Sequence, residues 1–119
     1  MVNENNIASL VAEAQKAGLV ALENAITKPM VVHGGARPYL VEGGVCGFAW
    51  VNVYGVRSNS KLGKVLSNLG FRKNSYEKSH QYWVFDGGQS MERKEAYARA
   101  FAAVLTAHGI ACHSNSRMD

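Results

Sequence analysis

The chain lacks any long hydrophobic run. No apolar stretch in its 119 residues approaches the roughly 18 consecutive apolar residues that a membrane-spanning helix needs. Its first residues, MVNENN, contain no basic segment followed by an apolar stretch, so we expect no secretion signal. The sequence therefore predicts no membrane partner and no export by a signal peptide.

Cysteine and proline are also scarce. Two prolines exclude a proline-rich linker protein, and two cysteines 66 positions apart form neither a disulfide scaffold nor a zinc ligand set. The histidines show no metal-ligand spacing either; they are His33, His80, His108 and His113. We expect no metal and no other cofactor.

Catalytic motifs are missing as well. The sequence contains no G-x-S-x-G nucleophile motif, no phosphate-binding loop with its lysine and no H-E-x-x-H zinc motif. The segment Asp86-Gly87-Gly88-Gln89-Ser90 leads into a helix and either caps it or, with Arg93 and Lys94, holds an anion. We therefore expect a protein without catalytic residues, without enzyme activity and without an evident small-molecule substrate.

The sequence does contain enough apolar side chains for one folded body. Apolar residues make up 47% of the chain, which is too much for wholesale disorder. Apolar residues at spacings of three and four predict an N-terminal helix over residues 5–26, which ends before Pro29. Gly18 costs this helix about 1 kcal/mol relative to alanine, which suggests a close neighbour at that point.

Residues 27–44 are the least regular part of the sequence. Four glycines and two prolines interrupt them, yet the segment is too apolar for a solvated linker. Two structures fit: an extended arm that lies along a surface, or a short hairpin through His33-Gly34-Gly35. The residues expected to contact a partner here are Met30, Val32, Tyr39 and Leu40.

The pattern from residue 45 onward predicts an alternation of strands and helices. We expect a strand at 45–54, a short helix opened by Ser58 or Asn59 and ended by Gly70, and strands at 71–76 and 80–85. A long helix at 91–108, capped by Ser90, and a final strand at 110–113 follow. This order predicts an α+β fold with a ferredoxin-like split βαβ (βαββαβ) sheet. The chain then divides into an N-terminal helix and extended arm at 1–44 and a ferredoxin-like core at 45–119.

The ferredoxin-like fold also bears on the distance between the two cysteines. The last strand lies beside the first in a ferredoxin-like sheet, so Cys46 and Cys112 could be neighbours. Without a secretion signal, reduced thiols are the default expectation.

The first strand of the core alternates small and aromatic side chains. Small residues suit the side covered by helices, which leaves Phe48, Trp50 and Tyr54 on the open face, together with Trp83 and Phe85. Residues 47–53 also resemble a signature of the RNA-recognition motif, although Cys46 stands at its basic position and the segment falls on the first strand instead of the third. Three interpretations follow: the N-terminal helix covers these rings, bases stack on them, or a protein partner binds them.

Positive charge is concentrated in the second half of the chain. Residues 1–56 carry three basic and four acidic side chains, whereas residues 57–119 carry ten and five. No acid interrupts the densest group, which we call the basic strip: Arg57, Lys61, Lys64, Arg72 and Lys73. The strip is either a contact for a phosphate backbone or an ordinary solvated surface.

Three segments together resemble a group of small tailed-bacteriophage proteins. They are CGFAWVNV at 46–53, the segment from Gln89-Ser90 through RKEAYA at 93–98, and SRMD at 116–119. That group combines a GFAWV-like strand, a Gln-Ser-capped alanine-rich helix and an Arg-hydrophobic-Asp terminus. The resemblance covers about residues 45–119, implies a viral origin and assigns no functional residue.

These observations favour a non-enzymatic phage virion-associated structural protein, a capsid, head or tail assembly component that acts through protein contacts. The expected location is the virion, or the host cytoplasm during infection, and the expected partners are other phage structural proteins or copies of the chain itself. The contact residues would be Met30, Val32, Tyr39, Leu40, Phe48, Trp50 and Tyr54. The alternatives are a small nucleic-acid-binding protein that uses the basic strip and the aromatic rings, and an inhibitor of a host protein.

Overall fold

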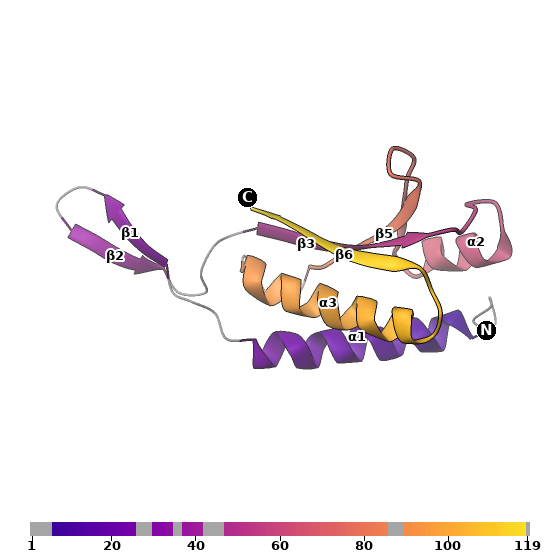
Figure 1. The fold of residues 1–119 in the computed structure, drawn as a ribbon, viewed down its shortest axis with the longest axis horizontal. Coiled ribbons are helices and arrows are strands. Elements are labelled where there is room, and N and C mark those ends of the chain that lie inside the picture. Colours follow the sequence, from indigo (N-terminus) through magenta and orange to yellow (C-terminus); the bar gives the residue numbers. More distant parts are fainter. Residues whose placement is uncertain (1–5, 26–29, 35–36, 42–46, 86–89, 119) are drawn as a thin grey trace.

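The structure, a computed structural model, describes residues 6–25, 30–34, 37–41, 47–85 and 90–118 (Figure 1). It contains three helices and two antiparallel sheets. The helices are α1 (Ile7–Asn24), α2 (Lys61–Asn68) and α3 (Met91–Ala107). The strands are β1 (Met30–Gly34), β2 (Arg37–Val41), β3 (Gly47–Tyr54), β4 (Arg72–Asn74), β5 (Ser79–Trp83) and β6 (Cys112–Met118). The expected α+β character is confirmed.

The larger sheet has the strand order β4-β5-β3-β6, and every neighbouring pair is antiparallel. β3 is a central strand, with β5 on one side and β6 on the other. Its alternating sequence places Ala49, Val51 and Val53 on one face, where all three are buried. β6 pairs with β3 from Gly47↔Met118 to Val53↔Cys112. The final strand was expected at 110–113, so its position in the sequence was predicted several residues too early.

Helix α3 lies on the face of the sheet that buries these small residues. Its inward side chains Tyr97, Phe101 and Leu105 are almost fully buried. Tyr82 of β5 stacks on Phe101 with ring centroids 4.5 Å apart, and Gln15 of α1 donates a hydrogen bond to the Tyr82 hydroxyl at 3.2 Å. The core therefore joins α1, α3 and the sheet in one cluster.

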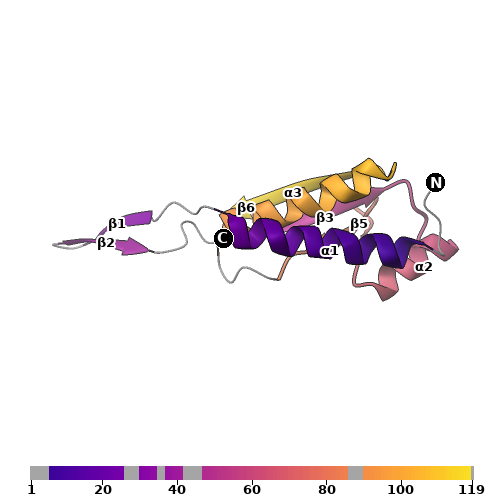
Figure 2. The same cartoon turned by 90° about the horizontal axis from the view of Figure 1, so that it is seen from below.

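The N-terminal helix α1 packs alongside α3, on the same side of the sheet (Figures 1 and 2). Its predicted apolar stripe is buried from Ile7 to Gly18 and half-buried beyond that point. A Cβ atom added at Gly18 would lie 2.8 Å from the Tyr97 ring, so the expected close neighbour is confirmed. The expectation that this helix covers Phe48, Trp50 and Tyr54 is wrong, because α1 lies against α3 and those side chains lie on the other face of the sheet.

Short polar and glycine signals end and begin the helices. The Ser60 hydroxyl, not Ser58 or Asn59, caps α2 by accepting a hydrogen bond from the Gly63 amide at 3.0 Å. Gly70 follows α2 with φ +102° and Gly109 follows α3 with φ +85°, a left-handed backbone that favours glycine. Both glycines end their helices where the sequence predicted.

The segment around residues 30–41 is a hairpin and not an extended arm. β1 and β2 pair antiparallel from Met30↔Val41 to Gly34↔Arg37, so the hairpin alternative is confirmed. It projects from the end of the molecule that holds the C-terminus (Figure 1). Within the described part of the chain, it contacts no other helix or strand.

The close contact at Gly18 predicts that a larger side chain at this position destabilises the protein. We expect Gly18→Val to lower the free energy of unfolding by about 1–3 kcal/mol, because the added side chain overpacks against Tyr97. Urea unfolding followed by circular dichroism measures the effect. Ser9→Val, at an exposed position of the same helix, is the matched control and should change stability much less. Equal stability of the two variants would contradict a tight α1–α3 contact.

Candidate functional site

β3 and β5 carry aromatic side chains on the face of the sheet that points away from α3. Because side chains alternate along β3 and Ala49, Val51 and Val53 point to the helices, Phe48, Trp50, Asn52 and Tyr54 lie on that face. Trp50 pairs directly with Trp83 of β5, and directly opposed residues share a face. We call the resulting group the aromatic face: Phe48, Trp50, Tyr54 and Trp83.

Three rings of the aromatic face contact one another. Trp50 and Trp83 stack with centroids 4.6 Å apart and an interplanar angle of 20°, and Phe48 meets Trp83 edge-on at 6.2 Å. These three side chains are half-buried, whereas Tyr54 is 37% exposed and the nearby Phe85 is 84% exposed. The two tryptophans are the only ones in the chain. The face therefore offers partly accessible rings held in a fixed arrangement.

Two cations lie over the Phe48 end of this face. The Lys94 ammonium is 5.4 Å from the Phe48 ring centroid, and the Arg117 guanidinium is 5.6 Å from it. Arg117 pairs with Phe48 across β3 and β6, while Lys94 comes from the first turns of α3 and is buried. No local pattern in the sequence connects either residue with the aromatic side chains. Only the register of the final strand reveals the contact of Arg117.

A buried polar network lies between the rings. The Asn52 side-chain oxygen Oδ1 accepts hydrogen bonds from Ser79 Oγ at 3.0 Å and Gln81 Nε2 at 2.9 Å. Trp83 Nε1 donates to Gln81 Oε1 at 3.2 Å, so the network also orients one ring of the stack. Asn52 Nδ2 and Trp50 Nε1 are buried without a hydrogen-bond partner among the described residues.

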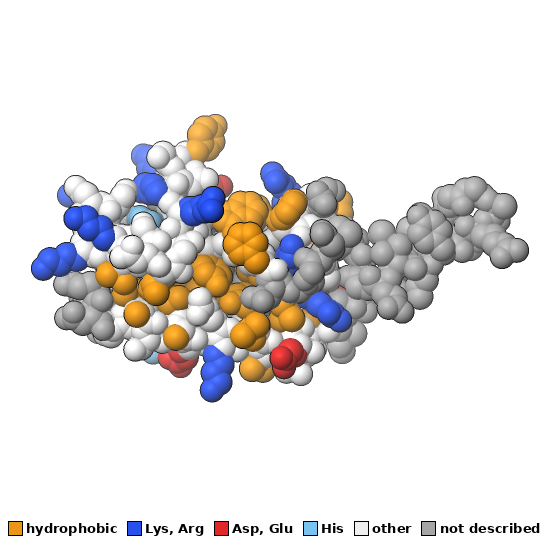
Figure 3. All heavy atoms as spheres, turned by 180° about the vertical axis from the view of Figure 1, so that it is seen from behind, with side chains coloured by type: hydrophobic (Ala, Val, Ile, Leu, Met, Phe, Trp, Pro, Cys, Tyr) orange, Lys and Arg blue, Asp and Glu red, His pale blue; other side chains and the backbone are white. Residues whose placement is uncertain are grey.

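The basic strip lies at the end of the molecule formed by α2 and β4. Arg57 precedes α2, Lys61 and Lys64 lie on α2, and Arg72 and Lys73 lie on β4; all five are exposed. Figure 3 shows Lys and Arg side chains gathered over this end. Arg72 pairs with Gln81, which in turn pairs with Asn52, so Arg72 stands beside the aromatic face. The structure thus places Arg72 on the same face of the sheet as the rings, whereas Lys73 pairs with His80 and belongs to the opposite face.

His80 is a buried titratable residue of β5. It pairs with Val53 on one side and Lys73 on the other, and its side chain is fully buried. Neither ring nitrogen has a hydrogen-bond partner in the described structure. Burial, and secondarily the Lys73 charge, lower the His80 pKa below its usual value of 6.5. The imidazole is therefore neutral at physiological pH.

The remaining polar candidates from the sequence have structural roles or lie outside the described residues. Ser90 Oγ accepts a hydrogen bond from the Arg93 amide at 3.3 Å, which is the expected cap of α3. Asp86, Gly87, Gly88 and Gln89 are outside the described residues, as is Cys46, so the expected Cys46–Cys112 relation is not described. Cys112 lies opposite Val53, whereas Gly47 lies at the other end of β3. Burial raises the pKa of the Cys112 thiol.

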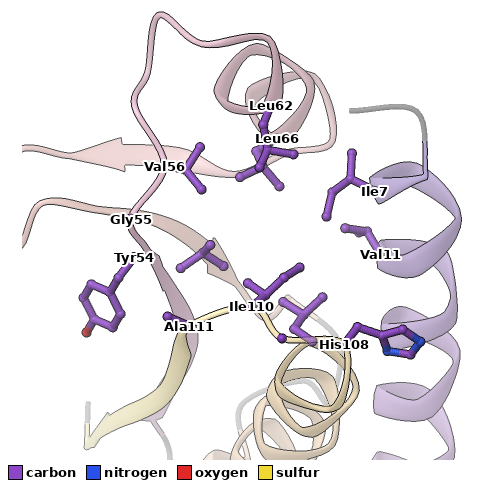
Figure 4. Close-up of a pocket in the computed structure, with 13 residues that line it drawn as sticks. Ile7, Val11, Tyr54, Gly55, Val56, Leu62, Leu66, His108, Ile110 and Ala111 are labelled. Carbon is purple, nitrogen blue, oxygen red and sulfur yellow. The ribbon is translucent and has the colours of Figure 1, made fainter. Parts of the chain in front are cut away.

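An open apolar cavity of about 620 Å³ lies between the N-terminal end of α1, α2 and the C-terminal end of α3 (Figure 4). Its lining includes Ile7, Val56, Leu62, Leu66 and Ile110, with His108 at its margin. The lining comes from several separate segments of the chain, so no local sequence pattern could reveal it. Among its described lining residues, only Tyr54 and His108 carry polar side-chain groups.

The four contact residues expected between 27 and 44 all lie on the hairpin. Val32 pairs with Tyr39, Leu40 pairs with Val31, and Met30 pairs with Val41. The structure therefore separates the predicted protein contacts into two places, the projecting hairpin and the aromatic face.

The described residues offer neither a metal site nor a membrane-spanning helix, and the chain resembles no known protein in the comparisons. Among the described residues, no group of three or more His, Cys, Asp or Glu could hold a metal ion, and no helix is long and apolar enough to cross a membrane. No protein-family model, curated protein or solved structure matches the chain.

The burial of His80 predicts acid sensitivity. Because its pKa is lowered in the folded state, the unfolded chain takes up a proton first as the pH falls below about 6.5, and stability falls with it. This group contributes a loss of at most about 1.4 kcal/mol per pH unit, which ends below the folded-state pKa. We expect urea unfolding of His80→Phe at pH 7 and pH 5 to show a smaller loss than the parent protein. His113→Phe, which removes an exposed imidazole from β6, should retain the parent's loss; the opposite ranking would contradict the assignment.

Proposed function

We propose that this chain is a non-enzymatic structural protein of a tailed-phage virion, a capsid, head or tail assembly component that acts through protein contacts. The observation that carries the proposal is the projecting hairpin of β1 and β2. The resemblance of residues 45–119 to small phage proteins supplies the viral context. The partners would be other phage structural proteins or further copies of the chain.

The physical argument rests on the isolation of the hairpin. A two-stranded hairpin alone is marginally stable in water at best, and it needs a third strand or a packing surface to become stable. Within the described part of the chain, no other element supplies that surface. The strand sequences MVVHG and RPYLV are rich in the apolar residues that such a surface would bury. A partner subunit that covers the hairpin would stabilise it.

We also propose that residues 45–119 form a ferredoxin-like unit. In the order β4-β5-β3-β6, helix α2 connects β3 to β4 with β5 between them, and helix α3 connects β5 to β6 with β3 between them. This arrangement of split connections supports the proposal. The unit has two uncommon features: α2 has only 8 residues, and α1 packs beside α3.

The proposed role of the hairpin can be tested by replacing residues 30–41 with a Gly-Ser linker of the same length. We expect the free energy of unfolding of the remaining body to stay within about 0.5 kcal/mol, because the hairpin makes no contact with the other described elements. Incorporation into particles should be lost, which mass spectrometry of particles assembled with the variant would measure. Normal incorporation of the variant would contradict the proposed role of the hairpin.

Particle composition tests the wider proposal. Quantitative mass spectrometry of purified virions should find the chain at a fixed copy number relative to the other structural proteins. Absence of the chain from purified particles would exclude the virion role, whatever the behaviour of the hairpin variant.

A further inference from the structure

We propose that the aromatic face and the adjoining basic strip bind single-stranded nucleic acid. The face presents stacked rings, and cations stand at one end and along one side of it. Helices α1 and α3 lie on the opposite side of the sheet (Figure 1). This site is distinct from the hairpin, so it goes beyond the proposed assembly role.

The arrangement of the rings suits unpaired bases. Residues two positions apart on a strand are about 7 Å apart, so Phe48, Trp50 and Tyr54 form a row of roughly 20 Å along β3. Tyr54 is exposed, as is Phe85, which follows Trp83 by two residues, and the Trp50–Trp83 pair lies between the ends of the row. Bases stack on aromatic side chains when they are unpaired, whereas a duplex keeps its bases inside. The face therefore favours a single strand.

The charges around the rings favour a phosphate backbone over an apolar protein surface. Arg117 stands at the Phe48 end, and Arg72 stands beside the middle of the face through its pairing with Gln81. The basic strip continues from Arg72 onto α2, and neither α2 nor β4 contains an acidic residue. The nearest acid in sequence, Glu77, accepts a hydrogen bond from Gln81 Nε2 at 2.9 Å. Apart from the Glu77 carboxylate beside Gln81, the charged side chains named here are cations, which complement a chain of phosphates.

The polar network predicts little base specificity. Reading a base edge requires side-chain donors and acceptors that are free to reach it. Asn52, Ser79 and Gln81 are buried and bond to one another, and the unpartnered Asn52 Nδ2 is buried with them, so these groups do not reach the surface of the face. Stacking tolerates any base because every base has a flat aromatic surface. Binding should therefore depend on strandedness and salt more than on sequence.

The two tryptophans allow a direct measurement. Since both lie in the aromatic face, intrinsic tryptophan fluorescence reports on this site alone. The probe is an oligothymidylate of about 20 nucleotides, longer than the roughly 4–16 nucleotides that single-strand-binding domains cover. We expect it to quench the emission, and its affinity to fall steeply between about 50 and 200 mM salt. A duplex of the same length should bind more weakly.

Variants separate stacking from general electrostatic attraction. Tyr54→Ala removes an exposed ring and should weaken binding about 5- to 150-fold, the range for loss of one stacked base. The pair Lys61→Glu and Lys64→Glu should weaken binding and reduce the salt dependence. Lys16→Glu reverses an exposed charge on α1, away from the site, and serves as the matched control. Circular dichroism confirms that each variant is folded.

Each outcome decides the proposal. Quenching by the single strand, with weak duplex binding and an unaffected Lys16→Glu control, supports it. No binding of either probe at low salt, equal or tighter binding of the duplex, or equal losses in the Lys16→Glu and Lys61→Glu/Lys64→Glu proteins would overturn it. The variant that lacks the hairpin should bind the oligonucleotide normally, so failure of the assembly role and failure of this site are distinguishable.

Discussion

The contact between Gly18 and the Tyr97 ring brings α1 against α3 and so determines which face of the sheet receives a second layer. A β-carbon at position 18 would occupy the space of that ring, so only glycine permits the two helices to approach this closely. With α1 held beside α3, the helices share one side of the sheet and Tyr82 packs on Phe101 between them and the sheet. The other side keeps its aromatic side chains uncovered by a helix.

Much of the secondary structure could be predicted because it depends on local patterns. The spacing of apolar residues identified α1 and α3, alternation identified β3 and the face of Trp50, and Gly70 and Gly109 marked the ends of two helices. The stripe on α1 showed that one side is buried but contained no information about what covers it. That choice depends on the fit between two residues 79 positions apart, Gly18 and Tyr97, and no local pattern encodes it.

The candidate site divides in the same way between local and non-local information. The rings of β3 and the five basic residues could be found from the sequence, because alternation and charge are local properties. The contact of Arg117 with Phe48 and the position of Arg72 beside the rings depend on strand register. The final strand was expected four residues long at 110–113, but it spans Cys112–Met118, and only this longer strand extends to Phe48. The cavity combines several segments of the chain and could not have been predicted.

The hairpin and the apolar cavity lie at opposite ends of the molecule's long axis (Figures 1 and 4). A molecule with different surfaces at its two ends has polarity. If copies were to join hairpin to cavity, the contact would be heterologous, since each partner would contribute a different patch. A two-fold pair would require both contacts at once, with the hairpin of each copy meeting the cavity of the other. Repetition of such a contact would produce a ring or a helical filament, and the rotation between successive copies would decide which.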